Sequence, residues 1–127
     1  MKKMKKIISA LMIGVVVVAM LAMLVAPVLA VSGSHQEGTG GIGWGIYAKV
    51  TGEWLTSDPT KFTASDAWAD VWGASTSQTY FVDGPGISTV YSEVTGQAWT
   101  GLYVHAWAWL SPPAYPLRYG GDYETWT

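Results

Sequence analysis

The residues of this chain whose types could take part in catalysis or metal binding are a pair of carboxylates and two histidines. Asp66 and Asp70 are four residues apart, so one helical turn or two strand alternations would bring both side chains to one face. Two such carboxylates are what glycosidases use as acid, base or nucleophile, although acids on a small acidic domain are mostly solvated surface residues. His35 and His105 are the only histidines, and the sequence offers no third ligand to complete a metal site. We therefore predict no catalytic residue, no metal and no cofactor.

Other catalytic arrangements are missing from the sequence. The chain has no cysteine, which removes thiolate nucleophiles and disulfides. It contains neither a Gly-x-Ser-x-Gly elbow nor a His-Glu-x-x-His zinc pair. Asp58, Asp83 and Asp122 each neighbour a glycine or a proline, where hydrogen bonds between side chain and backbone in turns explain them. The sequence predicts a protein that is not an enzyme.

Aromatic side chains are the remaining candidates for function. The chain contains 8 Trp and 7 Tyr, and several of them fall in the run from Gln97 to Leu110. If this run is one β-strand, alternation gives it an aliphatic face and an aromatic face. The aromatic face carries the residues that we predict to bind a ligand: Trp99, Tyr103, Trp107 and Trp109.

Two interpretations of this aromatic face stay open at the level of sequence. In the first, a second sheet covers the face and makes it part of the core. In the second, the face is exposed and makes contact with a glycan, a cell surface or another copy of the chain. The second interpretation predicts a non-enzymatic β-sandwich protein that acts by surface contact, either by binding a glycan or cell surface or by forming a homo-oligomer.

The N-terminal segment predicts export. Residues 1–6 are basic and residues 7–30 are almost wholly apolar, which is the pattern of a signal peptide. Small residues around Ala30 indicate cleavage after this position, so we predict a signal peptide over residues 1–30 and a secreted, extracellular protein. The apolar run also reaches the length that spans a bilayer. The alternative is an uncleaved membrane anchor that holds the protein at the cell surface.

The chain beyond the export segment is acidic. Only Lys49, Lys61 and Arg118 remain there as basic residues, against nine carboxylates. Without a basic stripe, nucleic acid and anionic lipid are not expected as partners.

Alternating patterns predict an all-β fold, a small antiparallel β-sandwich of roughly six or seven strands over residues 42–127. The clearest pattern is Ile42 to Leu55, with apolar residues at even positions. Gly41, Gly43 and Gly45 fall on its outer parity, which suggests a bulge or a place where another backbone or a ligand approaches closely. The even positions of this run and of residues 98–110 are predicted to form the core.

Two segments lack a clear pattern. Residues 31–41 are rich in glycine and serine without periodicity, and we expect a flexible leader there. Residues 63–73 fit a capped helix as well as a strand. We favour the strand, because Ala67-Trp68-Ala69 and Ala106-Trp107-Ala108 are parts of a weak internal repeat.

The run Gly101-Leu102-Tyr103-Val104-His105-Ala106-Trp107, together with the terminal aromatic run Tyr123–Trp126, resembles the C-terminal half of the lactococcin-type small secreted bacteriocins. The similarity covers under a third of the exported chain, and the His- and Asn-rich middle of that family is absent. The resemblance implies a β-sandwich released through a signal peptide. As an alternative function, it implies a small secreted antimicrobial protein.

Overall fold

The computed structural model describes residues 29–127. The predicted signal peptide lies almost entirely outside these residues, so export, cleavage and anchoring stay predictions. Within the described part of the chain, no helix is long and apolar enough to cross a membrane.

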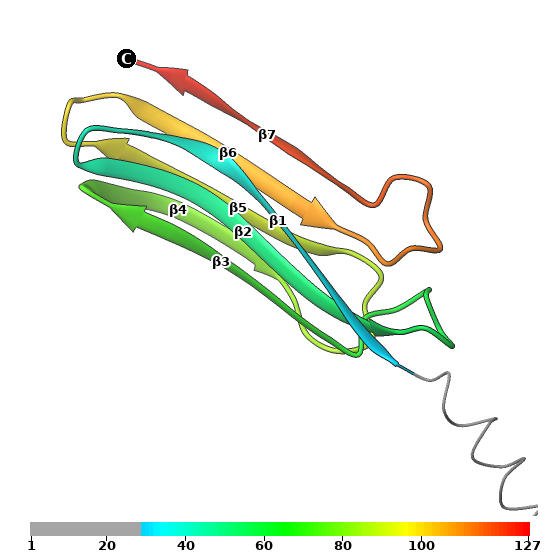
Figure 1. Ribbon diagram of the computed structural model, residues 1–127. Coiled ribbons are helices and arrows are strands. Elements are labelled where there is room, and N and C mark those ends of the chain that lie inside the picture. The colour runs from blue at the N-terminus through cyan, green and yellow to red at the C-terminus, as the bar shows by residue number, and fades with distance from the viewer. Residues whose placement is uncertain (1–28) are drawn as a thin grey trace, which may run out of the picture.

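Seven antiparallel strands form two sheets that face each other (Figure 1). The first sheet has the order β1-β2-β3 and the second the order β4-β5-β6-β7, so hydrogen-bonded neighbours are always consecutive in sequence. The strands are β1 (Ala30–Gly41), β2 (Trp44–Leu55), β3 (Ala64–Trp72), β4 (Ala74–Val82), β5 (Val90–Ala98), β6 (Tyr103–Leu110) and β7 (Tyr119–Trp126). The predicted all-β fold with antiparallel sheets is confirmed.

Even-numbered residues of the central strands fill the space between the sheets. Alternation along a strand sends these side chains inward and the odd ones outward. The buried apolar residues of β2, β5 and β6 are Trp44, Ile46, Ala48, Val50, Trp54, Val90, Val94, Ala98, Val104, Ala106, Ala108 and Leu110. The predicted core is therefore confirmed for most of its positions. Ile42 is an exception, 92% exposed, because it lies in the turn between β1 and β2.

Residues 31–41, expected as a flexible leader, instead form most of β1. This strand pairs with β2 along its whole length, from Ala30 opposite Leu55 to Gly41 opposite Trp44. The expectation was wrong because β1 is held mainly by its backbone hydrogen bonds, and its small polar side chains leave no periodic signal. The sheets therefore begin before residue 42.

The run from Gln97 to Leu110, interpreted from sequence as one strand, is the end of β5, a turn and β6. The N–H of Gly101 donates to the carbonyl of Ala98 at 2.9 Å, and the φ of Gly101 is +93°, which glycine adopts at little cost. The single-strand interpretation was wrong because the turn does not interrupt the sequence pattern. Trp99 at an odd position and Leu102 at an even position continue the alternation of aromatic and aliphatic residues. Residues 63–73, by contrast, contain β3, as favoured from sequence.

The free edge of β3 is closed by groups that follow later in the chain. The Gly84 N–H donates to the Ser65 carbonyl at 3.3 Å. The Asp83 carboxylate accepts from the Ala67 N–H at 3.0 Å. An edge strand otherwise leaves such backbone groups without a partner. These bonds therefore join the two sheets along one side and protect that edge from pairing with another chain.

Replacing Ser92 with alanine is expected to lower the free energy of unfolding by about 0.5–1.5 kcal/mol, because the 2.6 Å hydrogen bond from the Ser92 hydroxyl on β5 to the Trp68 carbonyl of β3 is lost. Ser92 is fully buried, so water does not readily replace the hydroxyl. Urea denaturation followed by tryptophan fluorescence measures the loss. Ser77→Ala is the control, since the Ser77 hydroxyl also donates to a backbone carbonyl, that of Thr95, but at an exposed position. An equal loss in both variants would contradict the role given to the buried bond.

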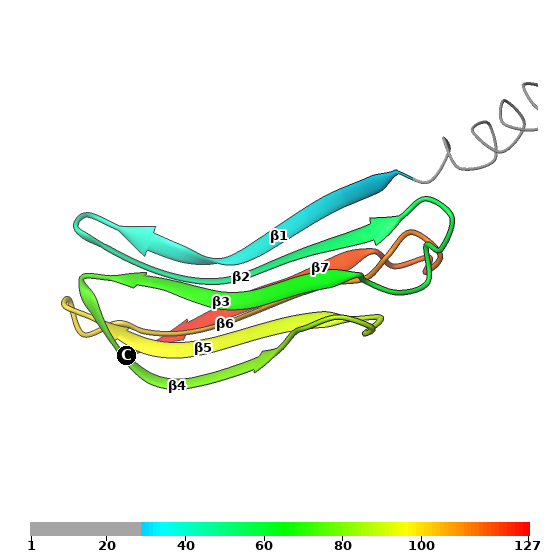
Figure 2. The ribbon, with the colours of Figure 1, turned by 90° about the horizontal axis from the view of Figure 1, so that it is seen from below.

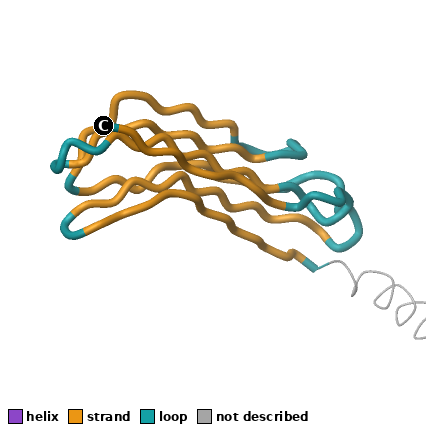
Figure 3. The backbone as a smooth tube through the Cα atoms, turned by 90° about the horizontal axis from the view of Figure 1, so that it is seen from above, coloured by secondary structure: helices purple, strands orange, loops and turns teal. Residues whose placement is uncertain are grey.

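Both sheets bend in the same direction (Figures 2 and 3). As a result, the outer face of the β1-β2-β3 sheet is concave and the outer face of the β4-β5-β6-β7 sheet is convex. We use the names concave face and convex face for these two surfaces below. The alternation that fills the core therefore leaves two outer surfaces of different shape.

Candidate functional site

Three of the four predicted binding residues lie on the convex face. Tyr103, Trp107 and Trp109 are odd-numbered residues of β6 and are partly buried, whereas the even-numbered residues of β6 are in the core. None of the described strands packs over this face. The question left open by the sequence is thereby answered for these three rings, which lie at the surface.

Trp99, the fourth predicted residue, is not part of this row. It lies in the turn between β5 and β6 and is 68% exposed. Its indole N–H donates to the Ile42 carbonyl at 3.1 Å, and its backbone N–H donates to the Gly73 carbonyl at 3.0 Å. Trp99 therefore fastens turns together at one end of the two sheets and does not extend the row.

β7 holds two rings of the row in place. Tyr103 stacks on Trp126, with ring centroids 5.5 Å apart and an interplanar angle of 7°. The Trp109 indole lies over Gly120, where an added Cβ would come within 2.7 Å of the ring. A glycine on the neighbouring strand thus lets the Trp109 ring lie flat against the sheet. The row is held in a fixed orientation before any partner arrives, which lowers the entropy cost of binding.

His105 lies within the row, between two carboxylates. Its Nδ1 is 3.0 Å from Glu124 Oε1 on β7, and its Nε2 is 3.2 Å from Glu93 Oε2 on β5. Its ring also contacts Trp107, with centroids 4.9 Å apart. Burial alone lowers the pKa of His105, but the hydrogen bonds to Glu124 and Glu93 outweigh it and raise the pKa above its ordinary value of 6.5. The protonated imidazole donates to both carboxylates and links three strands.

The His105 contacts are expected to stabilise the protein more at low pH than at high pH. Because folding raises the pKa of His105, its contribution is complete below pH 6.5 and is lost as the pH rises through the raised pKa. The melting temperature of the wild type minus that of His105→Gln, measured from pH 5 to pH 9, should therefore decrease with pH. A difference that grows with pH would contradict the assigned contacts.

Sequence reasoning missed the neighbours of the row on other strands. Trp126 on β7 is 44% exposed, and Tyr80 on β4 is 60% exposed. Tyr80 contacts Tyr91 of β5, with ring centroids 6.0 Å apart. These neighbours can be found from sequence only if the strand register is known, and the register follows from the positions of the turns. The turn between β5 and β6 was not recognised, so the register could not be derived.

The carboxylates considered for catalysis lie on the other sheet. Asp66 and Asp70 share the concave face, two strand alternations apart. Asp70 forms an ion pair with Lys49 of β2. The two acids are therefore in different environments: of the pair, Asp66 alone has no side-chain partner among the described residues.

His35 lies in β1 and is not part of a flexible leader. Its Nε2 is 2.7 Å from Glu37 Oε1, and its ring contacts Tyr119 of β7, with centroids 4.8 Å apart. These contacts place His35 between β1 and the second sheet. Over residues 29–127, no group of three or more His, Cys, Asp or Glu side chains is arranged to hold a metal ion.

Comparisons with known proteins add nothing to this geometry. No family model, no curated protein and no solved structure matches the chain. Function is therefore inferred from the two outer faces.

Proposed function

We propose that this chain is a secreted, non-enzymatic protein that binds an extracellular glycan surface through the convex face. The observation that supports this proposal is the uncovered row of Tyr103, Trp107 and Trp109, extended by Trp126. Aromatic rings present flat apolar area, which suits the apolar faces of sugar rings. A convex face does not enclose a ligand, so its partner is broad, such as the packed glycan chains of a cell wall.

The charge of the convex face narrows the class of glycan. Glu93, Asp122 and Glu124 lie on this face, and His105 lies between Glu93 and Glu124. Anionic polymers, such as sulfated or phosphorylated glycans, are repelled by such a surface. Neutral glycans are therefore the expected partners.

Retention of the purified protein on washed, insoluble polysaccharides tests the proposal. We expect retention on neutral polymers, little effect of salt, and weak retention on anionic polymers. Trp109→Ala should lose retention, whereas Trp99→Ala removes an equally large but more exposed ring outside the row and should keep it. Failure to bind any neutral polymer, or an equal loss in both variants, would contradict glycan binding by this face.

Two other results would replace the proposal. A dimer that dissociates on dilution and is absent in Trp109→Ala would make the convex face an interface between copies of the chain. Killing of bacteria at low dose would favour the antimicrobial function that the bacteriocin resemblance implies. Size-exclusion chromatography over a concentration series and a growth-inhibition assay on the same sample provide these readouts.

A further inference from the structure

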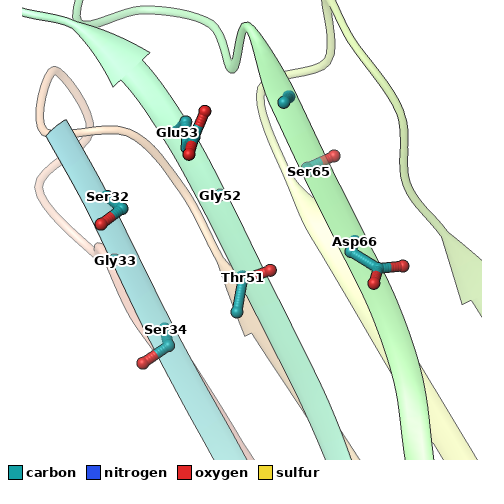
Figure 4. Close-up of a pocket in the computed structure, with 9 residues that line it drawn as sticks. Ser32, Gly33, Ser34, Thr51, Gly52, Glu53, Ser65 and Asp66 are labelled. Atoms are coloured by element: carbon teal, nitrogen blue, oxygen red, sulfur yellow. The ribbon is translucent and has the colours of Figure 1, made fainter. Parts of the chain in front are cut away.

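The concave face contains a groove. A hollow of about 560 Å³ spans β1, β2 and β3, within the size range of about 300–1,000 Å³ that is common for ligand sites. Its polar side chains are those of Ser32, Ser34, Thr51, Glu53 and Asp66 (Figure 4). A second hollow of about 460 Å³ shares Ser34 and Thr51 with the first and continues to Lys49 and Trp68. The two hollows form one groove across the sheet.

Two carboxylates of this groove have no partner. The chain has nine acidic residues, and Glu53 and Asp66 are the two whose side chains form no hydrogen bond or ion pair with another described residue. The others are engaged by a histidine, a lysine, a hydroxyl or a backbone N–H: Glu37, Asp58, Asp70, Asp83, Glu93, Asp122 and Glu124. The charges of Glu53 and Asp66 therefore do not serve to hold the fold.

The strand register places these two carboxylates close together. Thr51 is opposite Asp66, and Glu53 is opposite Ala64, so Glu53 and Asp66 are diagonal neighbours, about 7–8 Å apart at their Cα atoms. Both side chains lie on the face shown in Figure 4. Like charges at this distance repel each other weakly in water, and a cation between or beside them offsets that repulsion. This end of the groove is therefore complementary to positively charged groups.

Aromatic rings continue the groove along the same face. Trp68 lies opposite Lys49 and lines the second hollow. Further along, Tyr47 stacks on Trp72, with ring centroids 5.6 Å apart and an interplanar angle of 14°. The Trp72 indole lies over Gly45. The absence of a side chain at Gly45 allows this position, since an added Cβ there would overlap the indole. The face therefore presents, in order, the two carboxylates, the Trp68 ring and the stacked pair of Tyr47 and Trp72. This row extends along about 26 Å of strand.

We propose that the concave groove binds a single chain of amino sugars that carry free ammonium groups. Glu53 and Asp66 pair with ammonium groups, the hydroxyls of Ser34 and Thr51 bond to sugar hydroxyls, and Trp68 stacks on a ring. The ion pair between Lys49 and Asp70 neutralises the lysine, so no free cation repels the ligand. A basic peptide needs pockets for its side chains, whereas this groove offers flat rings and hydroxyls.

Calorimetric titration of the purified protein with a glucosamine oligomer tests the proposal. An N-acetylglucosamine oligomer of equal length and an oligolysine of similar charge are the comparison ligands. We expect the glucosamine oligomer to bind most tightly and its binding to weaken with added salt. The double variant Glu53→Gln/Asp66→Asn should lose about tenfold in affinity, and Trp68→Ala should also weaken binding.

Matched variants on the convex face separate this groove from the surface proposed above. Asp122→Asn and Trp109→Ala should bind the glucosamine oligomer as the wild type does. The double variant of the groove should still be retained on insoluble neutral polysaccharide. Unchanged melting temperatures show that the variants are folded. The proposal is overturned if the oligomer does not bind, if either comparison ligand binds as tightly, or if the double variant retains full affinity.

Discussion

Replacing Gly73 with alanine is expected to leave much of the protein unfolded. Gly73 is the single residue between β3 and β4, where the chain passes from one sheet to the other. Its φ of +60° costs an L residue about 1–2 kcal/mol, and an added Cβ would overlap the carbonyl oxygen of Gly43. Relief of this overlap requires movement of the turn between β1 and β2. We expect a total loss above about 4 kcal/mol, a large part of the stability of a small domain.

The control for Gly73→Ala is Gly86→Ala. Gly86 has a φ of +81°, and no atom lies within 4 Å of an added Cβ. Its substitution therefore carries backbone strain without the overlap and should cost about 1–2 kcal/mol. Guanidinium denaturation followed by tryptophan fluorescence compares the two variants. Equal losses would show that the contact with Gly43 is not what makes Gly73 necessary.

The strands that could be predicted from sequence are those that bury one face and expose the other. β2 has this pattern from Trp44 to Leu55, and its inward residues are buried as expected. β3 was ambiguous, because Trp68 and Trp72 share a face in a helix and in a strand alike. Pairing with β2 is what makes this segment a strand and not a helix. That pairing joins residues that are not neighbours in sequence.

β1 could not be predicted, because backbone hydrogen bonds to β2 hold it in place and its side chains give no pattern typical of a strand. Its glycines and serines match those of a linker, while its backbone pairs with β2 over its full length. A backbone donor or acceptor is the same in every residue, so such pairing leaves no compositional signal. The tight turn after Gly41 is the local feature that brings the two strands together.

The candidate sites show the same division between local and long-range information. Alternation within β6 correctly grouped Tyr103, Trp107 and Trp109, because this relation is local. The neighbours Trp126 and Tyr91 come from other strands, and only the register places them beside the row. The concave groove was missed for the same reason, since it combines single side chains from three strands.

The two outer faces point away from each other across one core. If each binds the glycan proposed for it, one molecule holds a single cationic chain against a neutral surface. Ala48, Ala106 and Ala108 are among the fully buried residues between the faces. We expect the two faces to bind independently, since they share no binding residue.

Replacing Trp107 with alanine is expected to abolish retention on neutral glycan while lowering the free energy of unfolding by only about 1–2 kcal/mol. Trp107 is partly buried against His105 and lies opposite Glu93 and Asp122 on the neighbouring strands. Since none of the described strands covers it, its removal opens no closed cavity. A central aromatic contact at an interface contributes about 2 kcal/mol or more to binding, which is a loss of at least about thirtyfold in affinity.

Trp54→Ala provides the matched control for stability, because Trp54 is only 6% exposed and belongs to the core. The same substitution there leaves a cavity between the sheets and should cost about 3–5 kcal/mol. Denaturant titration of both variants, beside the retention assay, separates a binding ring from a structural one. If Trp107→Ala is as destabilising as Trp54→Ala, or if it is retained on glycan as the wild type is, the convex face is not the binding surface.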